Sequence, residues 1–194
     1  MCYNYENAHP ELFYEVVEQL GFTLSKKLDY KYASEPRPTD QIQTLLLKGK
    51  DLELIHTTWG IKFNPKSPLI FNSRIETINN KAFWKKLFKE NRALLPMTGF
   101  YEWTGEKGHK VKRKIVLSDE KFFVVPALYH VENENLYTSL VTVPSNEFMT
   151  DIHYRMPAIL KPKEAFKLMQ ASIDEAIRMC EPYKGEMKIV DVGR

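Results

Sequence analysis

The first two residues of the chain, Met1 and Cys2, bring together groups that could do chemistry. Removal of Met1 would leave Cys2 with a free α-amine beside its thiol. These groups ordinarily titrate near about 7.7–8.0 and about 8.5, so both are partly deprotonated at neutral pH. The amine can condense with an aldehyde and the thiol can then close a thiazolidine ring. Alternatively, the thiol can attack a carbonyl with the amine as its base. Many proteins simply begin Met-Cys, so the other residues must show whether Cys2 has a chemical role.

A second set of polar residues occupies residues 71–77. Asn72, Arg74 and Glu76 alternate there, so on a strand their side chains would share one face. A strand face that carries an amide, a guanidinium and a carboxylate is usually solvated, but it can also line a polar site. This segment alone leaves both alternatives open.

Two further segments carry isolated titratable residues. Glu102 stands among aromatic residues in the stretch 100–103, where it is either sheltered from water, as a general acid or base would be, or turned outward by strand alternation. His153 and Arg155 are two positions apart before an apolar stretch, so they could project to the same side. A lone histidine is more often a hydrogen-bonded structural residue than a catalyst.

The elements that must position these residues follow from periodicity and turn residues. Pro10 predicts the start of a helix that Gly21 closes, and residues 24–40 are expected to form a surface loop. Lys48-Gly49-Lys50 predicts a tight turn between two strands, the second of which continues to Ile61. Further strands are expected at 93–96, 100–103, 111–117, 121–129 and 136–143.

Helices are expected after the strands as well as before them. Asn79 and Asn80 are predicted to cap a helix through Asn91, with an inward face of Phe83, Trp84, Leu87 and Phe88. Pro162 opens a helix to about residue 170, and Ser172 begins a capping box for another that ends before residue 182. Strands in the middle with flanking helices indicate an α+β fold.

Composition restricts the class of protein. The chain has 194 residues, 43% of them hydrophobic, which suits one domain, and its net charge of +3 permits a polyanionic partner without requiring one. Its two cysteines, Cys2 and Cys180, favour a reducing compartment over a disulfide framework, and Cys180 is expected to be a buried small hydrophobe. The five histidines are scattered, so no zinc pattern is present. No apolar run reaches membrane-spanning length and no secretion signal is apparent, so we expect an intracellular protein.

Five motifs taken together resemble the family of SOS response-associated peptidases (SRAP). They are Met-Cys at the start, Trp59-Gly60, and the segments 72–77, 99–103 and 152–157, and they occur in the family's order over residues 2 to about 160. The resemblance implies a single domain over residues 1–194, with a twisted antiparallel, barrel-like sheet and flanking helices. Residues of about 161–194 would form C-terminal helices and a tail.

The activity that the resemblance implies is covalent capture of abasic sites in single-stranded DNA, without a cofactor or metal. Cys2 would form a thiazolidine with the ring-opened deoxyribose, and Asn72 would orient Cys2. Glu102 and His153 would move protons. The same four residues would remove whatever precedes Cys2 autocatalytically, and lyase activity at abasic sites would be possible.

The DNA contacts implied by the resemblance are Arg74 and Arg155 on phosphates, and Trp59 and Phe63 at the bases. The chain departs from the family pattern at three places, one of which is the family's Asn-x-Ala-Pro loop, poorly reproduced around Tyr32-Ala33-Ser34. Family members commonly continue Cys-Gly-Arg, whereas Cys2 is followed here by Tyr3-Asn4. The tryptophans that often follow Trp-Gly are absent, which leaves Phe63 as the base-stacking residue of that stretch.

Two alternatives stay open beside the abasic-site reading. One is an N-terminal-nucleophile thiol peptidase or amidohydrolase, and the other is a non-covalent module that binds single-stranded DNA. The leading hypothesis predicts a cytoplasmic monomer that joins the nucleoid during a DNA damage response such as the SOS response, with no membrane partner.

Overall fold

Five strands of the computed structural model close into a barrel. β5 (Arg92–Thr104), β2 (Gln41–Lys48), β3 (Asp51–Trp59), β8 (Asn135–Pro144) and β7 (Phe123–Glu132) pair in that order, and β7 returns to β5. Only the β3–β8 pair in this ring is parallel. The structure describes all residues except 1, 20–22, 24–32, 50, 107–108 and 191–194. The expected α+β fold around a barrel-like sheet is confirmed.

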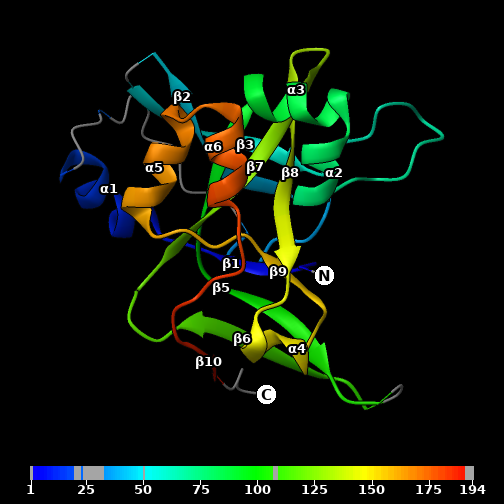
Figure 1. The fold of residues 1–194 in the computed structure, drawn as a ribbon, viewed down its shortest axis with the longest axis vertical. Helices are drawn as coiled ribbons and strands as arrows, with labels where there is room; N and C mark the ends of the chain where they lie inside the picture. The colour runs from blue at the N-terminus through cyan, green and yellow to red at the C-terminus, as the bar shows by residue number, and fades with distance from the viewer. Residues whose placement is uncertain (1, 20–22, 24–32, 50, 107–108, 191–194) are drawn as a thin grey trace.

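Further strands extend the barrel and bring distant parts of the chain together. β1 (Tyr5–Asn7) and β6 (Val111–Leu117) both pair with β5, and β10 (Met187–Val190) pairs with β6. On β8 lie β4 (Asn72–Arg74) and β9 (Arg155–Pro157). The chain start, β1 and β9 therefore meet at mid-height, between the barrel above and β6, β10 and α4 below (Figure 1).

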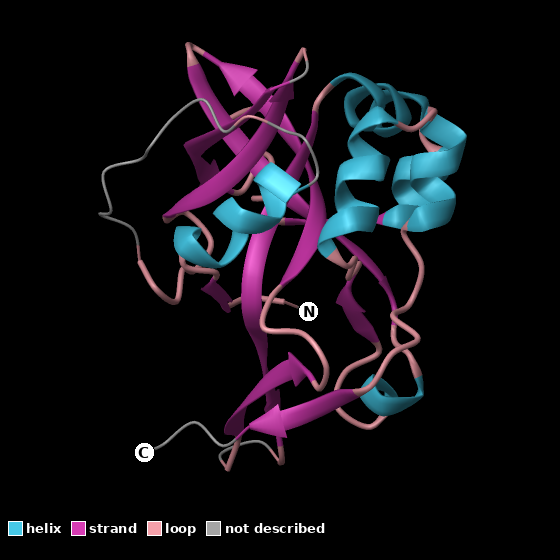
Figure 2. Cartoon of the chain, turned by 90° about the vertical axis from the view of Figure 1, so that its left-hand side faces the viewer, coloured by secondary structure: helices cyan, strands magenta, loops and turns pink. Residues whose placement is uncertain are grey.

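The helices pack mainly beside the upper part of the sheet, as Figure 2 shows. They are α1 (Pro10–Gln19), α2 (Ile75–Asn80), α3 (Ala82–Glu90), α4 (Glu147–Thr150), α5 (Pro162–Gln170) and α6 (Ile173–Met179). In the part of the chain that the structure describes, no helix is long and apolar enough to cross a membrane. The core is continuous through the barrel; its fully buried side chains include Leu54, Leu94, Leu128 and Leu140.

Several elements have the predicted bounds because local signals agree with the tertiary context. The strand 111–117 and the helix that Pro162 opens are confirmed, and the Ser172 hydroxyl caps α6 by accepting from the Glu175 N–H at 3.2 Å. Gly49 adopts φ +64° in the β2–β3 turn, a conformation that glycine reaches without strain. Cys180 is buried, as expected. The predicted helix end at Gly21 and most of the predicted loop 24–40 lie outside the described residues.

The prediction for residues 71–77 is wrong beyond Arg74. The strand ends there and α2 begins at Ile75, because Ile75 and Ile78, one helical turn apart, are both buried. Glu76 therefore lies in the first turn of a helix and does not share a strand face with Asn72.

The predicted helix caps and inward face also need correction. Asn79 and Asn80 end α2, and α3 starts after an extended Lys81 without a side-chain cap. Phe88 is buried as predicted, but Phe83 is 55% exposed. The sequence showed no strand in the tail, yet β10 pairs with β6 from Met187 onward.

Candidate active site

Cys2 is held beside β5 by the backbone of the residues that follow it. Tyr5 pairs with Phe100 on β5, and the N–H of Tyr101 donates to the carbonyl of Asn4 at 2.9 Å. The start of the chain thus runs antiparallel to the segment that carries the aromatic motif. This pairing brings Cys2 to the part of β5 where the side chains of residues 100–103 lie.

Asn72 fixes the other side of Cys2. β4 pairs in parallel with β8, with Asn72 opposite Leu140, and from there the Asn72 side-chain amide donates to the Cys2 carbonyl at 2.8 Å. Asn72 Oδ1 is buried and has no hydrogen-bond partner among the described residues. A buried acceptor without a donor is costly in a folded protein, so this oxygen is available to a group that arrives later.

The Cys2 thiol is inaccessible and protonated near neutral pH. Cys2 is 0% exposed, and its Sγ lies 3.8 Å from the Asn4 carbonyl oxygen. Burial raises the pKa of the thiol far above its ordinary value, and the negative charge of Glu102 raises it further. In this structure the thiol is therefore a proton donor and not a ready thiolate.

Glu102 is the electrostatic neighbour that two of the predicted site residues share. It projects from β5 and is 5% exposed, so it is sheltered from water and does not point outward. Its charge acts on both the Cys2 thiol and the His153 imidazole. The structure thus brings a carboxyl, a thiol and an imidazole within electrostatic reach of one another.

His153 is oriented by the backbone on either side of it. Its backbone N–H donates to the Met149 carbonyl at 2.8 Å, and its Nδ1 lies 2.9 Å from the Arg155 backbone nitrogen and 3.2 Å from the Arg155 carbonyl oxygen, so Nδ1 accepts from the N–H in one tautomer and donates to the oxygen in the other. With Nδ1 as acceptor, the neutral ring carries its proton on Nε2. Burial lowers the pKa of His153, an effect that the charge of Glu102 partly opposes. The imidazole is therefore neutral at pH 7.

Arg155 is buried, whereas a contact with a DNA phosphate would require it at the surface. It is 6% exposed, and its two terminal nitrogens donate to the Glu76 carboxylate at 2.7 and 3.1 Å. One of them also reaches the carbonyl of Thr142 at 2.6 Å. Arg155 joins α2, β8 and β9 in this way. Sequence reasoning missed this role of Glu76, although the spacing of the two isoleucines around it could have indicated a helix.

The other predicted DNA contacts divide between surface and core. Arg74 is exposed at the end of β4, where a phosphate could reach it. Trp59 is 0% exposed, packs against Tyr5 and Phe71, and donates from Nε1 to the Phe71 carbonyl at 2.9 Å. Because its ring is covered by Tyr5 and Phe71, Trp59 cannot stack with a base, and its role here is to support those two residues.

Phe63 belongs to a cluster of aromatic rings at the edge of the molecule. Its ring centroid lies 5.2 Å from that of Phe83, 5.6 Å from that of Trp84 and 5.2 Å from that of His130. This cluster lies in the most basic part of the chain, in which one acidic residue accompanies Lys62, Lys66, Arg74, Lys81, Lys85, Lys86 and Lys89.

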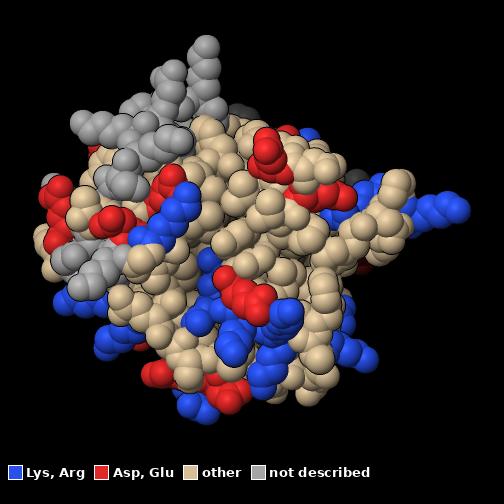
Figure 3. Space-filling model, turned by 90° about the horizontal axis from the view of Figure 1, so that it is seen from above, with Lys and Arg blue, Asp and Glu red and all other residues tan. Residues whose placement is uncertain are grey.

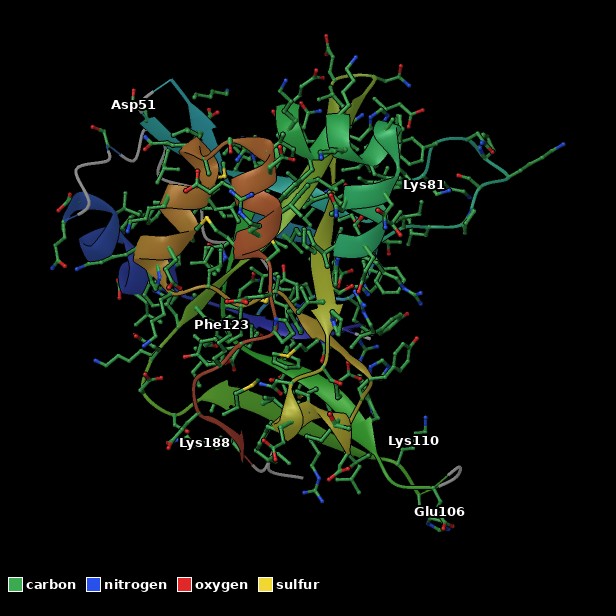
Figure 4. The ribbon with its side chains drawn as sticks, in the orientation of Figure 1. Asp51, Lys81, Glu106, Lys110, Phe123 and Lys188 are labelled. Atoms are coloured by element: carbon green, nitrogen blue, oxygen red, sulfur yellow. The ribbon has the colours of Figure 1, made fainter. Side chains whose placement is uncertain are left out.

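One face of the molecule carries clustered cations. Figure 3 shows Lys and Arg side chains gathering on the face seen from above. Lys81, at the α2–α3 junction, lies on the side of the molecule where the chain starts, whereas Phe123 points into the interior (Figures 1 and 4). A polyanion that approaches the chain start would meet the exposed Arg74, two residues after the Asn72 that holds the Cys2 carbonyl.

Comparison with known proteins identifies relatives along the whole chain. The family model described as SOS response associated peptidase (SRAP) matches residues 1–194. The abasic site processing protein YoqW of Bacillus subtilis (strain 168) is 28% identical over 191 residues, which cover 90% of this chain and 84% of that protein. The abasic site processing protein YedK of Escherichia coli (strain K12) is 27% identical over 157 residues, covering 75% and 70% of the two chains.

Solved structures share the fold at lower identity. A protein from Bacteroides thetaiotaomicron superposes with a TM-score of 0.76 at 21% identity, covering 97% of this chain and 90% of that one. A protein from Bordetella bronchiseptica gives a TM-score of 0.77 at 16% identity, covering 98% of this chain and 100% of that one. The barrel with its added strands and helices is therefore a recurrent architecture.

Proposed function

The chain belongs to the SOS response associated peptidase (SRAP) family, and we propose that it processes abasic sites in single-stranded DNA by covalent capture on Cys2. The names of its relatives support an activity on abasic sites. The observation that carries the chemical part is the placement of Cys2, whose carbonyl is held by Asn72 and whose thiol lies in the field of Glu102.

The reaction begins once Cys2 has a free α-amine. The amine adds to the C1′ aldehyde of the ring-opened deoxyribose, and loss of one water gives an imine. The Cys2 sulfur then adds to the imine carbon, and the thiol proton passes to the nitrogen. The product is a thiazolidine; two bonds to C1′ have formed, one water has left, and no oxidant or reductant is needed.

The order of steps follows the state of the Cys2 thiol, whose pKa burial raises in the structure with Met1 attached. A protonated thiol is a poor nucleophile, so the amine reacts first and the sulfur follows when a base takes its proton. Glu102 is the base placed to do so. His153, neutral and with its proton on Nε2, donates a hydrogen bond to the sugar hydroxyl, while the proton that leaves with the water comes from the reacting amine by way of Glu102.

Asn72 is a positioning residue in this scheme. Its amide nitrogen holds the Cys2 carbonyl, while its Oδ1 is open to a new donor. The α-amine of Cys2 or a hydroxyl of the sugar supplies such a donor. Either hydrogen bond to Asn72 Oδ1 would form only in the reacting complex, and it would there remove the energetic cost of a buried acceptor without a donor.

The same residues support removal of whatever precedes Cys2. The thiol attacks the preceding carbonyl and forms a thioester as the amide nitrogen takes up a proton. Water then hydrolyses the thioester, which releases the preceding residue as an acid and restores the thiol. We include this autocatalytic step because covalent capture requires the free amine.

A single-stranded substrate would use Arg74, which is exposed, and Phe63, which is half-buried in its aromatic cluster. Arg74 can bind a phosphate, and Phe63 can stack with an unpaired base, which a duplex would not offer. We propose that one chain acts as a monomer. A general thiol peptidase acting in trans is less well supported, because the buried, protonated Cys2 thiol cannot reach a bulky peptide in this state.

The test uses protein whose amino terminus has been verified by intact mass. We expect a band resistant to denaturation when it is mixed with single-stranded DNA that carries one abasic site. The band should be absent with intact DNA and with Cys2→Ser. A stable band with Cys2→Ser would overturn the proposal, as would no band from protein with a free Cys2 amine.

A further inference from the structure

Two exposed tyrosines directly follow the two residues at the centre of the proposed reaction. Tyr3 follows Cys2 and is 48% exposed, and Tyr154 follows His153 and is 62% exposed. Other large hydrophobic side chains are equally exposed, but these two stand out because each directly follows a residue of the proposed site. Neither residue has a role in the chemistry derived above.

Each ring is held in place from within the protein. The Tyr3 ring meets the Phe71 ring edge to face at 5.6 Å, and Phe71 in turn meets the buried ring of Trp59 at 6.0 Å. The Tyr154 ring lies nearly parallel to the His153 ring, with centroids 4.6 Å apart and an angle of 24° between the planes. One face of Tyr154 is therefore covered and the other is left to solvent.

We propose that Tyr3 and Tyr154 are stacking platforms for the two bases that flank the abasic nucleotide, one on each side. The inference rests on the proposed function. An abasic nucleotide leaves a gap in the stack, so each flanking base lacks a partner that an aromatic ring can replace. Preorganised rings lose little freedom on binding, and stacking tolerates any base because every base has a π-face.

The charge around the tyrosines favours DNA over an apolar protein partner. Arg74 is exposed near Asn72, which itself touches Cys2, and the segment 62–89 is strongly basic. The Arg155–Glu76 pair, next to Tyr154 in sequence through Arg155, adds no net charge. Cations beside exposed rings match alternating phosphates and bases along a single strand.

The experiment separates stacking from covalent chemistry. A single strand with a tetrahydrofuran abasic analogue has no aldehyde and cannot crosslink, and 2-aminopurine is placed on its 5′ or 3′ side. We expect the protein to quench 2-aminopurine on both sides. Tyr3→Leu should abolish the quench on one side and Tyr154→Leu on the other, each weakening binding roughly tenfold. Tyr3→Phe and Tyr154→Phe keep the ring and should behave as wild type.

The outcomes distinguish this inference from the proposed function. If the wild type crosslinks to aldehyde-bearing DNA while both leucine variants keep the quench and bind the analogue within twofold, the tyrosines are not stacking platforms and the proposed function stands. If the phenylalanine variants fail like the leucine variants, the hydroxyls and not the rings are responsible, which also overturns the inference. Failure of the wild type to crosslink contradicts the proposed function itself.

Discussion

Two sets of polar residues lie near β8 and β9: the Arg155–Glu76 ion pair and the Cys2 site. They differ in which of their polar atoms have hydrogen-bond partners. At the Arg155–Glu76 pair, the terminal nitrogens of the guanidinium meet both carboxylate oxygens and the Thr142 carbonyl, and only the guanidinium Nε lacks a partner among the described residues. At the Cys2 site, Asn72 Oδ1 has no partner among the described residues and the Cys2 sulfur has one long contact.

The difference separates a structural group from a reactive one. A buried guanidinium whose terminal nitrogens meet a carboxylate stabilises one arrangement of the chain, and removing the guanidinium leaves the carboxylate without its partner. A thiol, an imidazole and a carboxyl that shift one another's proton affinity are instead ready to exchange protons with a ligand. The two groups should therefore respond in opposite ways to substitution.

The largest effect is expected at Glu102. Glu102→Gln keeps the size and polarity of the side chain but removes the base, so the rate of crosslinking should fall roughly 100- to 1,000-fold. The melting temperature should change little. The measurement is a time course on denaturing gels, with Glu106→Gln, an exposed acid in the β5–β6 turn, as the matched control. An unchanged rate would remove Glu102 from the mechanism.

Arg155 should show the reverse behaviour. Arg155→Met leaves Glu76 without its partner and should cost about 2–3 kcal/mol, less than a fully buried pair because the Glu76 side chain is 46% exposed. That corresponds to a loss of about 5–10 °C in melting temperature by calorimetry. The exposed Arg74→Met is the control and should leave stability unchanged. If Arg155→Met weakened DNA binding and kept full stability, the result would support the phosphate contact that the sequence predicted for Arg155.

A smaller effect is expected from acid. Burial alone would raise the pKa of Glu76, but the hydrogen bonds and charge of Arg155 outweigh it, and the net pKa is lowered. The stabilisation is therefore fully present above the unfolded carboxyl pKa of about 4.3 and is lost as pH falls through the lower folded pKa. Glu76→Gln should be less stable than wild type by about 1 kcal/mol at pH 7, with the gap closing in acid. Denaturant titrations from pH 7 to 3 would show this, and a constant gap would contradict it.

The smallest effect concerns the titration of His153. Burial lowers its pKa, so the NMR midpoint should lie below the ordinary value of about 6.5. Because Glu102 opposes that shift, Glu102→Gln should move the midpoint lower still. His153→Gln assigns the resonance. A midpoint that rises in Glu102→Gln would mean that the carboxyl and the imidazole do not face each other.

Part of this comparison was accessible from sequence. The five motifs predicted which residues gather near Cys2, because Asn72, Glu102 and His153 each stand in a short segment with a recognisable pattern. The α+β class and the helix at Pro162 followed from periodicity and start signals, whereas the barrel followed from the resemblance to the family. These predictions depend on local order of residues, which a sequence displays.

The rest depends on contacts between distant segments. Nothing near Arg155 indicates that its charge would meet Glu76, 79 positions earlier, and the exposed fraction of Trp59 depends on Tyr5 and Phe71 closing over it. β10 was missed because a four-residue strand at the end of the chain has too little pattern to stand out, and it forms by pairing with β6.

The measurement that tests the central claim most directly is the mass of the crosslink after proteolytic and nuclease digestion. Protein with a free Cys2 amine is reacted with abasic single-stranded DNA, without a reducing agent. We predict one adduct, located on the amino-terminal peptide, whose mass is the sum of peptide and sugar fragment less one water, with no free thiol at Cys2. An adduct on a lysine, or one in which the Cys2 thiol still reacts with an alkylating agent, would contradict the account.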